Sequence, residues 1–249
     1  MYLAASTRCF PDVPFMESLQ RLSGLEFSSC EIVVGNRPCD LAPEYILSQP
    51  KQAARDCMAF RTIAPSVCFF DIEPDDPDYF TKFEACCDLA KQLRVFTISI
   101  RSAELGTPYN EEIERLRRAN AIGLHMGLLI GLLTQRGRIA ESCESVRSLC
   151  RSVPELSVTL DPSQFIYNYE RPINFDSIIP LVCNVHLRDT TKKAEQVQIG
   201  QGTLEYNKLI LQLAKNNYRG ALCVDLGLLP GISQDSELRK MRFLLESLI

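Results

Sequence analysis

The chain alternates short apolar segments with longer amphipathic ones along its whole length. The apolar segments are rich in Val, Ile, Leu and Cys, which is typical of buried β-strands. Strands are predicted at residues 2–6, 30–34, 62–70, 95–100, 124–130, 156–160, 184–187 and 221–224. Helices are predicted around residues 14–23, 48–58, 79–92, 110–123, 139–151, 174–179, 204–216 and 236–248.

Local signals set several of these boundaries. Asn110 is a good N-cap, since Glu111 follows it in the first turn. Gly123 is expected to end that helix, so the fifth strand is predicted to start at once. The Gly200-x-Gly202 pair is too short for a dinucleotide fingerprint and is interpreted as a turn that leaves Thr203 as a helix cap.

Eight strands separated by helices predict a closed parallel barrel, because parallel neighbours need crossover helices. The chain has 249 residues, close to the ~250 typical of a (β/α)8 barrel. We therefore expect residues 1–249 to form one (β/α)8 TIM barrel domain of the α/β class. A doubly wound open sheet is the competing fold.

Polar residues occupy alternate positions on four predicted strands. The polar positions are Thr97, Ser99 and Arg101, then Ser157, Thr159 and Asp161, then Asn184, His186 and Arg188, and finally Cys223 and Asp225. Side chains alternate along a strand, so every second one points into the barrel. These polar side chains should therefore line the barrel interior. Because active sites of such barrels lie where strands end, a polar site is predicted near Arg101, Asp161, His186, Arg188 and Asp225. Glu31 is interpreted as a further lining residue.

Four segments carry a resemblance to a known family. The segments are LDPSQF at 160–165, VHLRD at 185–189, IGQG at 199–202 and YRGALCVD at 218–225. Their order and spacing resemble those of the xylose isomerase-like TIM barrels, a superfamily of sugar isomerases, sugar and sugar-phosphate epimerases and apurinic-site endonucleases. The resemblance implies one divalent metal held by a Glu after strand five, an Asp after strand six, a His on strand seven and a Glu after strand eight.

Carried over by position, the resemblance implies that Asp161, His186 and Asp225 are metal ligands. The ion would be Mn, Mg, Zn or Co, and His186 and Asp225 would also be the catalytic residues. The strand-five Glu is missing, with Leu129 or Ile130 expected in its place. The metal site implied is therefore incomplete, and one acid-base group is absent.

Two functions follow from this pattern. The first is a sugar, sugar-phosphate or polyol isomerase or epimerase in which Arg101, Gln164 and Arg188 bind substrate. The alternative is a non-catalytic, metal-free barrel that binds a carbohydrate or an anionic small molecule through Arg101 and Arg188. An apurinic-site endonuclease is disfavoured, because its site resembles a cluster of several histidines and the chain has only two. His125 is interpreted as structural.

The composition of the chain limits the classes of partner that we expect. The net charge of -4 and pI near 5.4 give no general attraction to nucleic acid. No apolar run reaches the ~18 residues that span a bilayer, and no secretory signal is seen, so a cytoplasmic protein without a membrane partner is expected. Apolar outer segments leave self-association open. The eleven cysteines form no C-x-x-C pair and are expected to be reduced, mostly buried thiols.

Overall fold

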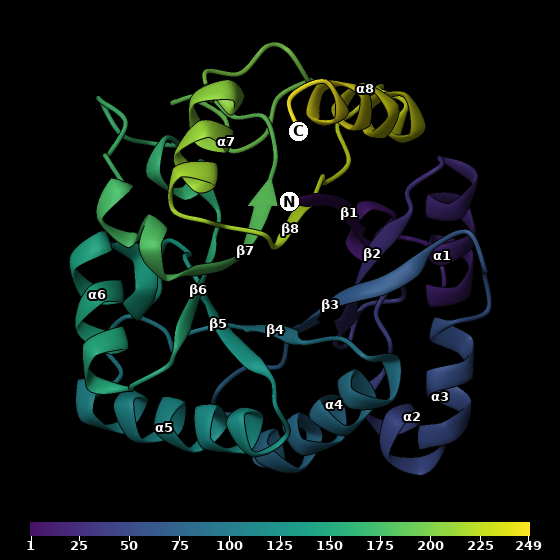
Figure 1. The fold of residues 1–249 in the computed structure, drawn as a ribbon, viewed down its shortest axis with the longest axis vertical. Coiled ribbons are helices and arrows are strands. Elements are labelled where there is room, and N and C mark those ends of the chain that lie inside the picture. Colours follow the sequence, from purple (N-terminus) through teal and green to yellow (C-terminus); the bar gives the residue numbers. More distant parts are fainter.

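The computed structural model describes residues 1–249 and shows eight strands closed into a barrel in chain order (Figure 1). The strands are β1 (Tyr2–Ser6), β2 (Ser29–Val34), β3 (Ala64–Phe70), β4 (Thr97–Ile100), β5 (Leu129–Leu133), β6 (Ser157–Leu160), β7 (Val182–Leu187) and β8 (Ala221–Val224). Every neighbouring pair is parallel, including β8 against β1. The (β/α)8 barrel is therefore confirmed, and the open sheet is wrong.

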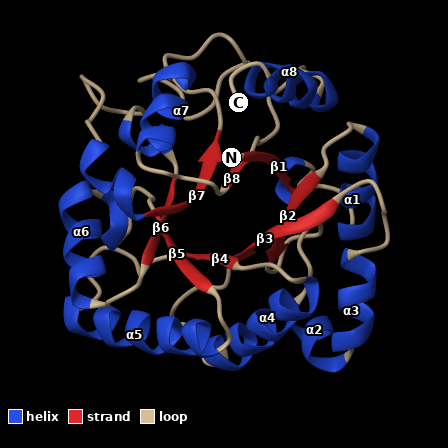
Figure 2. Ribbon diagram, in the orientation of Figure 1, coloured by secondary structure: helices blue, strands red, loops and turns tan.

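Helices surround the barrel on all sides (Figure 2). They are α1 (Phe15–Gly24), α2 (Pro43–Ser48), α3 (Pro50–Cys57), α4 (Tyr79–Leu93), α5 (Tyr109–His125), α6 (Cys143–Ser152), α7 (Tyr206–Lys215) and α8 (Gln234–Glu246). Short 3-10 turns are η1 (Thr7–Cys9), η2 (Ile139–Glu141), η3 (Pro162–Phe165) and η4 (Asp176–Leu181). None of these helices combines the length and the apolar character needed to cross a membrane.

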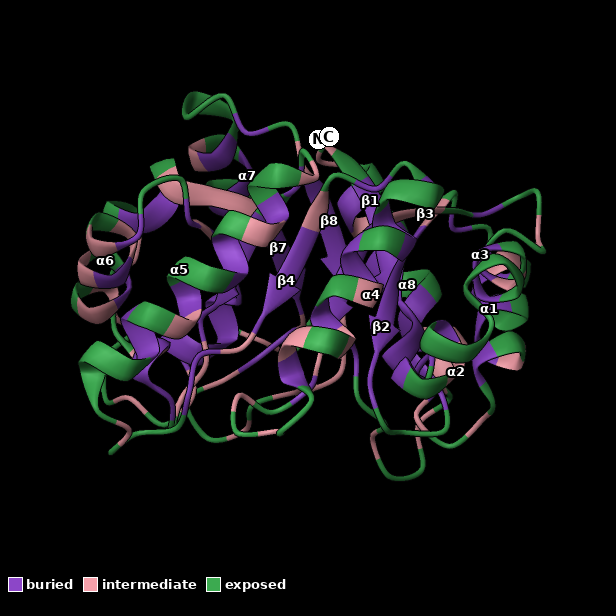
Figure 3. Ribbon diagram, turned by 90° about the horizontal axis from the view of Figure 1, so that it is seen from below, coloured by how far each residue is buried: buried purple, intermediate pink, exposed green.

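The apolar core lies between the strands and the helices, as the buried inner faces of the helices show (Figure 3). Inside the barrel, apolar residues form only two small clusters. One is Ala4, Val67, Ala221 and Cys223, and the other is Val33, Phe69 and Leu133. Polar side chains occupy other interior positions, so the barrel interior is suited to hold a polar site.

The fifth strand starts five residues later than the sequence predicts. Helix α5 continues through Gly123, where an added Cβ would lie 2.5 Å from the Ile130 side chain, so this glycine permits close helix-strand packing. The helix ends instead at His125, and Gly127, whose φ is 76°, follows the C-cap residue Met126. The Gly127 and Leu128 amides donate back to the carbonyls of Leu124 and Gly123, as in a Schellman motif. His125, predicted on the strand, is therefore the last residue of α5.

Three other boundaries also differ from prediction. The Pro-rich connection before residue 50 is itself helical, since α2 and α3 each begin with a proline at the first helical position. Asn110 lies inside the first turn of α5, whose N-cap is Pro108. Thr203 does not cap a helix, because α7 begins at Tyr206.

All eleven cysteines are free, and eight of them are buried. Burial raises the pKa of the Cys150 thiol to about 11, and burial followed by the charge of Asp40 raises that of Cys39 to about 12. These thiols are protonated at neutral pH and pack as small apolar side chains.

The buried carboxylate of Asp189 organises the loop after β7. Its Oδ2 accepts hydrogen bonds from the amides of Gly200 at 2.7 Å and Gly202 at 3.0 Å. A Cβ on Gly202 would collide with this carboxylate and come 2.8 Å from the Thr190 amide nitrogen. The two glycines thus bring the backbone close to Asp189, which holds the loop beside the barrel mouth.

We expect Gly202→Ala to lower the free energy of unfolding by about 1–3 kcal/mol, because the backbone must move off Asp189. Urea unfolding measures this change. Gly24→Ala is the matched control, since nothing lies within 4 Å of its added Cβ and alanine favours the end of α1. Equal effects of the two substitutions would contradict the tight approach at Gly202.

Candidate functional site at the mouth of the barrel

A cavity of about 250 Å³ opens at the carboxyl ends of the strands. All six residues predicted from the sequence line it, namely Arg101, Asp161, Gln164, His186, Arg188 and Asp225. Pairing of β7 with β8 places His186 beside Cys223, so Arg188 and Asp225 follow at adjacent strand ends. The side chains that were predicted to point inward from these strands thus lie together at one end of the barrel.

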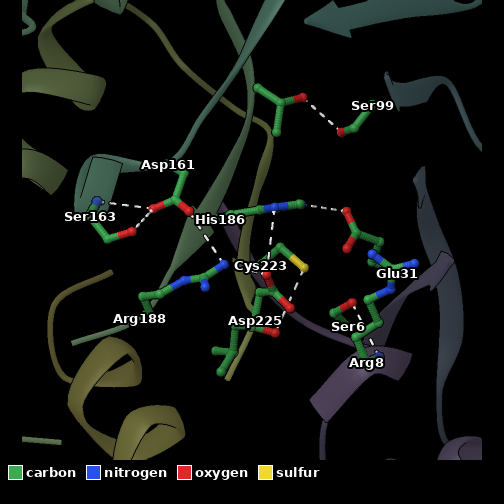
Figure 4. Close-up of polar contacts among 12 residues, drawn as sticks. Ser6, Arg8, Glu31, Ser99, Asp161, Ser163, His186, Arg188, Cys223 and Asp225 are labelled. Carbon is green, nitrogen blue, oxygen red and sulfur yellow. Dashed lines mark hydrogen bonds and ion pairs between the residues drawn. The ribbon is translucent and has the colours of Figure 1, made fainter. Parts of the chain in front are cut away.

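Glu31 and His186 meet inside the barrel from strands β2 and β7. Nε2 of His186 lies 2.7 Å from Oε1 of Glu31, and both side chains are almost fully buried (Figure 4). Asn184 donates to Glu31 at 3.4 Å and to Ser99 at 3.2 Å, and the Ser99 and Thr159 hydroxyls are 2.7 Å apart. A buried hydrogen-bond network therefore supports the floor of the cavity.

The charge of His186 follows from its neighbours. Burial alone lowers its pKa, but the Glu31 carboxylate, helped by Asp225 and Asp161, outweighs burial and raises the pKa to about 9. The imidazole is thus protonated at neutral pH. Its Nδ1 lies 4.0 Å from Oδ2 of Asp225, so each ring nitrogen faces a carboxylate.

The guanidinium of Arg188 lies between three carboxylates. Its Nη2 is 2.6 Å from Oδ2 of Asp225 and 3.3 Å from Oδ2 of Asp161, and its Nη1 is 3.6 Å from Oε1 of Glu195. Burial acts to lower the pKa of Arg188, but Asp161 and Asp225 outweigh it and raise that pKa. Burial likewise acts to raise the pKa of Asp225, yet Arg188 and His186 hold it below its usual value.

Asp161 and Gln164 are fixed by the short turn η3 that follows β6. Oδ1 of Asp161 accepts from the amide and hydroxyl of Ser163 at 2.9 and 2.6 Å. The Gln164 amide donates to Glu195 at 2.9 Å and to Asp161 at 3.3 Å, and its oxygen accepts from the Arg136 amide at 3.1 Å. Gln164 thus ties the β5, β6 and β7 loops together at the cavity wall.

A second charged group lies across the cavity, at the ends of β1, β3 and β4. Arg8 forms a two-point ion pair with Asp40 at 3.1 and 2.9 Å, and both Arg8 and Arg101 pair with Asp71. Arg37 also lines the cavity, is exposed, and makes no side-chain hydrogen bond or ion pair. This side therefore offers a free cationic group to a ligand.

The ring of Phe69 lies close to two of these cations. The guanidinium carbons of Arg8 and Arg101 lie 5.3 and 5.7 Å from its ring centroid, and the His186 ring meets it edge-on at 5.6 Å. Such distances are typical of cation-π contacts. Phe69 thus packs against both arginines at the mouth.

Sequence reasoning missed part of this site. Arg8, Arg37 and Phe69 were not predicted as lining residues, and Glu31 was not predicted to pair with His186. At strand five, the inward residue at the strand end is Leu133, which packs with Val33 and Phe69. The expectation of Leu129 or Ile130 was wrong, because the strand begins later than predicted.

Comparisons with known proteins identify the fold. No protein-family model matches the chain, and no curated protein matches it. A solved D-tagatose 3-epimerase-like protein is 18% identical with a TM-score of 0.75, over 100% of this chain and 97% of its own. The IOLI protein, solved with a bound zinc atom, is 14% identical with a TM-score of 0.76, over 100% and 98%. A xylose isomerase-like TIM barrel protein from Mycobacterium smegmatis, in complex with magnesium, is 13% identical with a TM-score of 0.77, over 99% and 96%.

The chain has the xylose isomerase-like barrel fold. The resemblance found in four sequence segments is therefore confirmed at the level of the fold. Two of these similar structures contain a metal ion.

The residues at the mouth do not fit a divalent ion. The predicted ligands Asp161, His186 and Asp225 surround the mouth, but Nη2 of Arg188 already contacts Oδ2 of both carboxylates, at 3.3 and 2.6 Å. Leu133 supplies no ligand atom at the strand-five position. A Mg²⁺ or Mn²⁺ ion prefers about six oxygen-rich contacts and would lie beside an existing positive charge.

Another group of potential ligands lies deeper in the barrel. Glu31, His186 and Cys223 have ligand atoms within 4.8 Å of one another. Nε2 of His186 is already hydrogen-bonded to Glu31, and burial raises the pKa of the Cys223 thiol well above its usual value. This group is thus arranged as an ion pair beside a protonated thiol.

Proposed function

We propose that this xylose isomerase-like barrel binds an anionic sugar, a sugar phosphate or a sugar acid, and is a sugar isomerase/epimerase-like protein. One observation carries the proposal: the cavity has a basic side with a free arginine and an opposite side rich in carboxylates. Sugar-processing names among the structural neighbours support the sugar class.

The basic side suits the anionic group of the ligand. Arg37 has no hydrogen-bond or ion-pair partner within the chain, and Arg101, which lines the same cavity, pairs with Asp71 and lies 3.6 Å from Glu73. Arginine binds phosphate and carboxylate groups through paired, charge-assisted hydrogen bonds. A ligand anion would therefore complete the coordination of Arg37.

The opposite side suits sugar hydroxyls. Asp161, Glu195 and Asp225 line the cavity from the β6 to β8 side, and their carboxylates accept hydrogen bonds but donate none when ionised. Protonated His186 adds a donor at the floor of the cavity. A polyhydroxylated ligand would find acceptors and a donor here, and its charged end would face Arg37.

The one-sided placement of the carboxylates favours isomerisation over epimerisation. Strand β3, across the barrel from β7, contributes Phe69 to the cavity, and β5 contributes Leu133. A proton can move between neighbouring carbons on one face with a single base, whereas inversion at a carbon needs groups on both faces. Asp225, beside His186, is the base that we assign to such a transfer.

Titration calorimetry with matched ligands tests the proposal. We expect ribose 5-phosphate and glucuronate to bind more tightly than ribose and glucose. Arg37→Met should weaken binding of the anions by about 10- to 100-fold, the value of one or two charge-assisted hydrogen bonds. Arg117→Met, an exposed change on α5 outside the cavity, is the control. Equal affinity for charged and neutral sugars would contradict the proposal.

A second function, binding without catalysis, is favoured by Leu133 and by the ion pairs that already occupy Arg188. Incubation of bound sugar phosphates in D₂O separates the two. An isomerase would incorporate deuterium at the carbon beside the carbonyl, and Asp225→Asn would abolish this exchange. Saturable binding of the same ligands with no exchange would show a binding protein instead.

A further inference from the structure

We propose that the guanidinium of Arg188 takes the place of the divalent metal ion at the mouth of this barrel. The protein would then carry its own fixed cation and would assemble its ligand site without a metal. This inference does not depend on which sugar binds, or on whether the protein is an enzyme.

The guanidinium of Arg188 lies where a shared cation would. Asp161 comes from the end of β6, Asp225 from the end of β8, and Glu195 from the loop after β7, yet all three carboxylates approach Arg188. Nη2 alone lies 3.3 and 2.6 Å from Oδ2 of Asp161 and Asp225. One nitrogen thus joins the two strand-end carboxylates, as a shared cation would (Figure 4).

No carboxylate occupies the strand-five position of this site. Leu133 occupies the inward position at the end of β5 and is packed against Val33 and Phe69, so no donor approaches from that side. His186 directs Nε2 to Glu31 and Nδ1 towards Asp225. Nε2 is thus taken up by Glu31, whereas Nδ1 makes no hydrogen bond, so His186 could offer an ion one ring nitrogen at most.

Manganese binding tests this proposal on the intact protein after dialysis against EDTA. Electron paramagnetic resonance counts free Mn²⁺ directly and requires no substrate. We expect the unchanged protein to bind no Mn²⁺ saturably below 1 mM. Arg188→Met removes the guanidinium at similar length and should create a Mn²⁺ site, which Leu133→Glu added to it should strengthen at least tenfold. Arg188→Lys keeps the positive charge and should bind none.

Two results would overturn the proposal. The first is saturable Mn²⁺ binding by the unchanged protein that is lost in Asp161→Asn and in Asp225→Asn. The second is a folded Arg188→Met protein, verified by near-UV circular dichroism, that binds no more Mn²⁺ than the unchanged protein. If Arg188→Met does not fold, thermal unfolding of the unchanged protein decides: a midpoint that is the same in EDTA and in 1 mM Mn²⁺ supports the proposal, and a rise in Mn²⁺ contradicts it.

Discussion

Glu31→Gln is expected to lower the free energy of unfolding by roughly 3 kcal/mol at pH 6, because it removes the charge that faces protonated His186 inside the barrel. The pKa of His186 is raised from 6.5 to about 9, and each pKa unit corresponds to ~1.4 kcal/mol. Burial acts to lower the pKa of His186, and the Glu31 carboxylate is the main cause of its rise.

The pH dependence has a definite sign. Because the pKa of His186 is higher in the folded chain, its stabilisation is fully present below pH 6.5 and is lost as pH rises through about 9. The cost of Glu31→Gln should therefore be large at pH 6 and smaller at pH 9.5. Urea unfolding at the two pH values measures it.

A matched background makes this test specific. His125, exposed at the end of α5, is the only other histidine, so His125→Ala leaves His186 as the single imidazole in an NMR titration. In that background the His186 signal should titrate near pH 9, and Glu31→Gln should move the transition to lower pH. An unchanged titration, or an equal cost at both pH values, would refute the charged pair.

Asp40→Ala is expected to lower the free energy of unfolding by about 3–5 kcal/mol, because it leaves the buried guanidinium of Arg8 without its two-point partner. Burial acts to lower the pKa of Arg8, and the hydrogen bonds that Arg8 donates to Asp40 are the largest effect that raises it. Asp71 remains close to Arg8 but is shared with Arg101, so it cannot compensate fully.

An exposed ion pair is the control for this substitution. Glu17 and Arg21 pair across one turn of α1, with side chains 44% and 46% exposed. Solvent screens such pairs, so Glu17→Ala should cost less than about 0.5 kcal/mol. Chemical denaturation of both variants measures the contrast. A cost for Asp40→Ala no larger than that of the control would show that Arg8 does not need its buried partner.

The sequence alone predicts the barrel because each strand has its own local signal. The strands at 2–6 and 221–224 are predicted to their last residue, and strand parity places Asp161, His186, Arg188 and Asp225 at one end. The fifth strand is mislocated because Gly123 was interpreted as a helix stop, whereas it serves helix-strand packing. In a sequence, a glycine is compatible with a helix end and with close helix-strand packing. Only the contact with Ile130 in the structure distinguishes the two.

Contacts across the barrel could not be predicted. The Glu31 and His186 pair joins residues 155 positions apart, and it depends on the register between all intervening strands. Arg8 lies in the 3-10 turn η1 and Arg37 in the loop after β2, and neither belongs to a family motif, so no pattern marked them. The position of the Arg188 guanidinium between two carboxylates is likewise a matter of side-chain geometry, although the residues themselves were all predicted at the mouth.

Binding of a sugar phosphate by metal-free protein tests the central claim most directly. Ribose 5-phosphate is titrated into EDTA-dialysed protein, then into the same protein with 1 mM Mn²⁺, with ribose as the neutral reference. We expect saturable binding with the same Kd in both conditions, and far weaker binding of ribose. Binding that requires Mn²⁺, or that is equal for ribose and its phosphate, would contradict a metal-independent site for an anionic sugar.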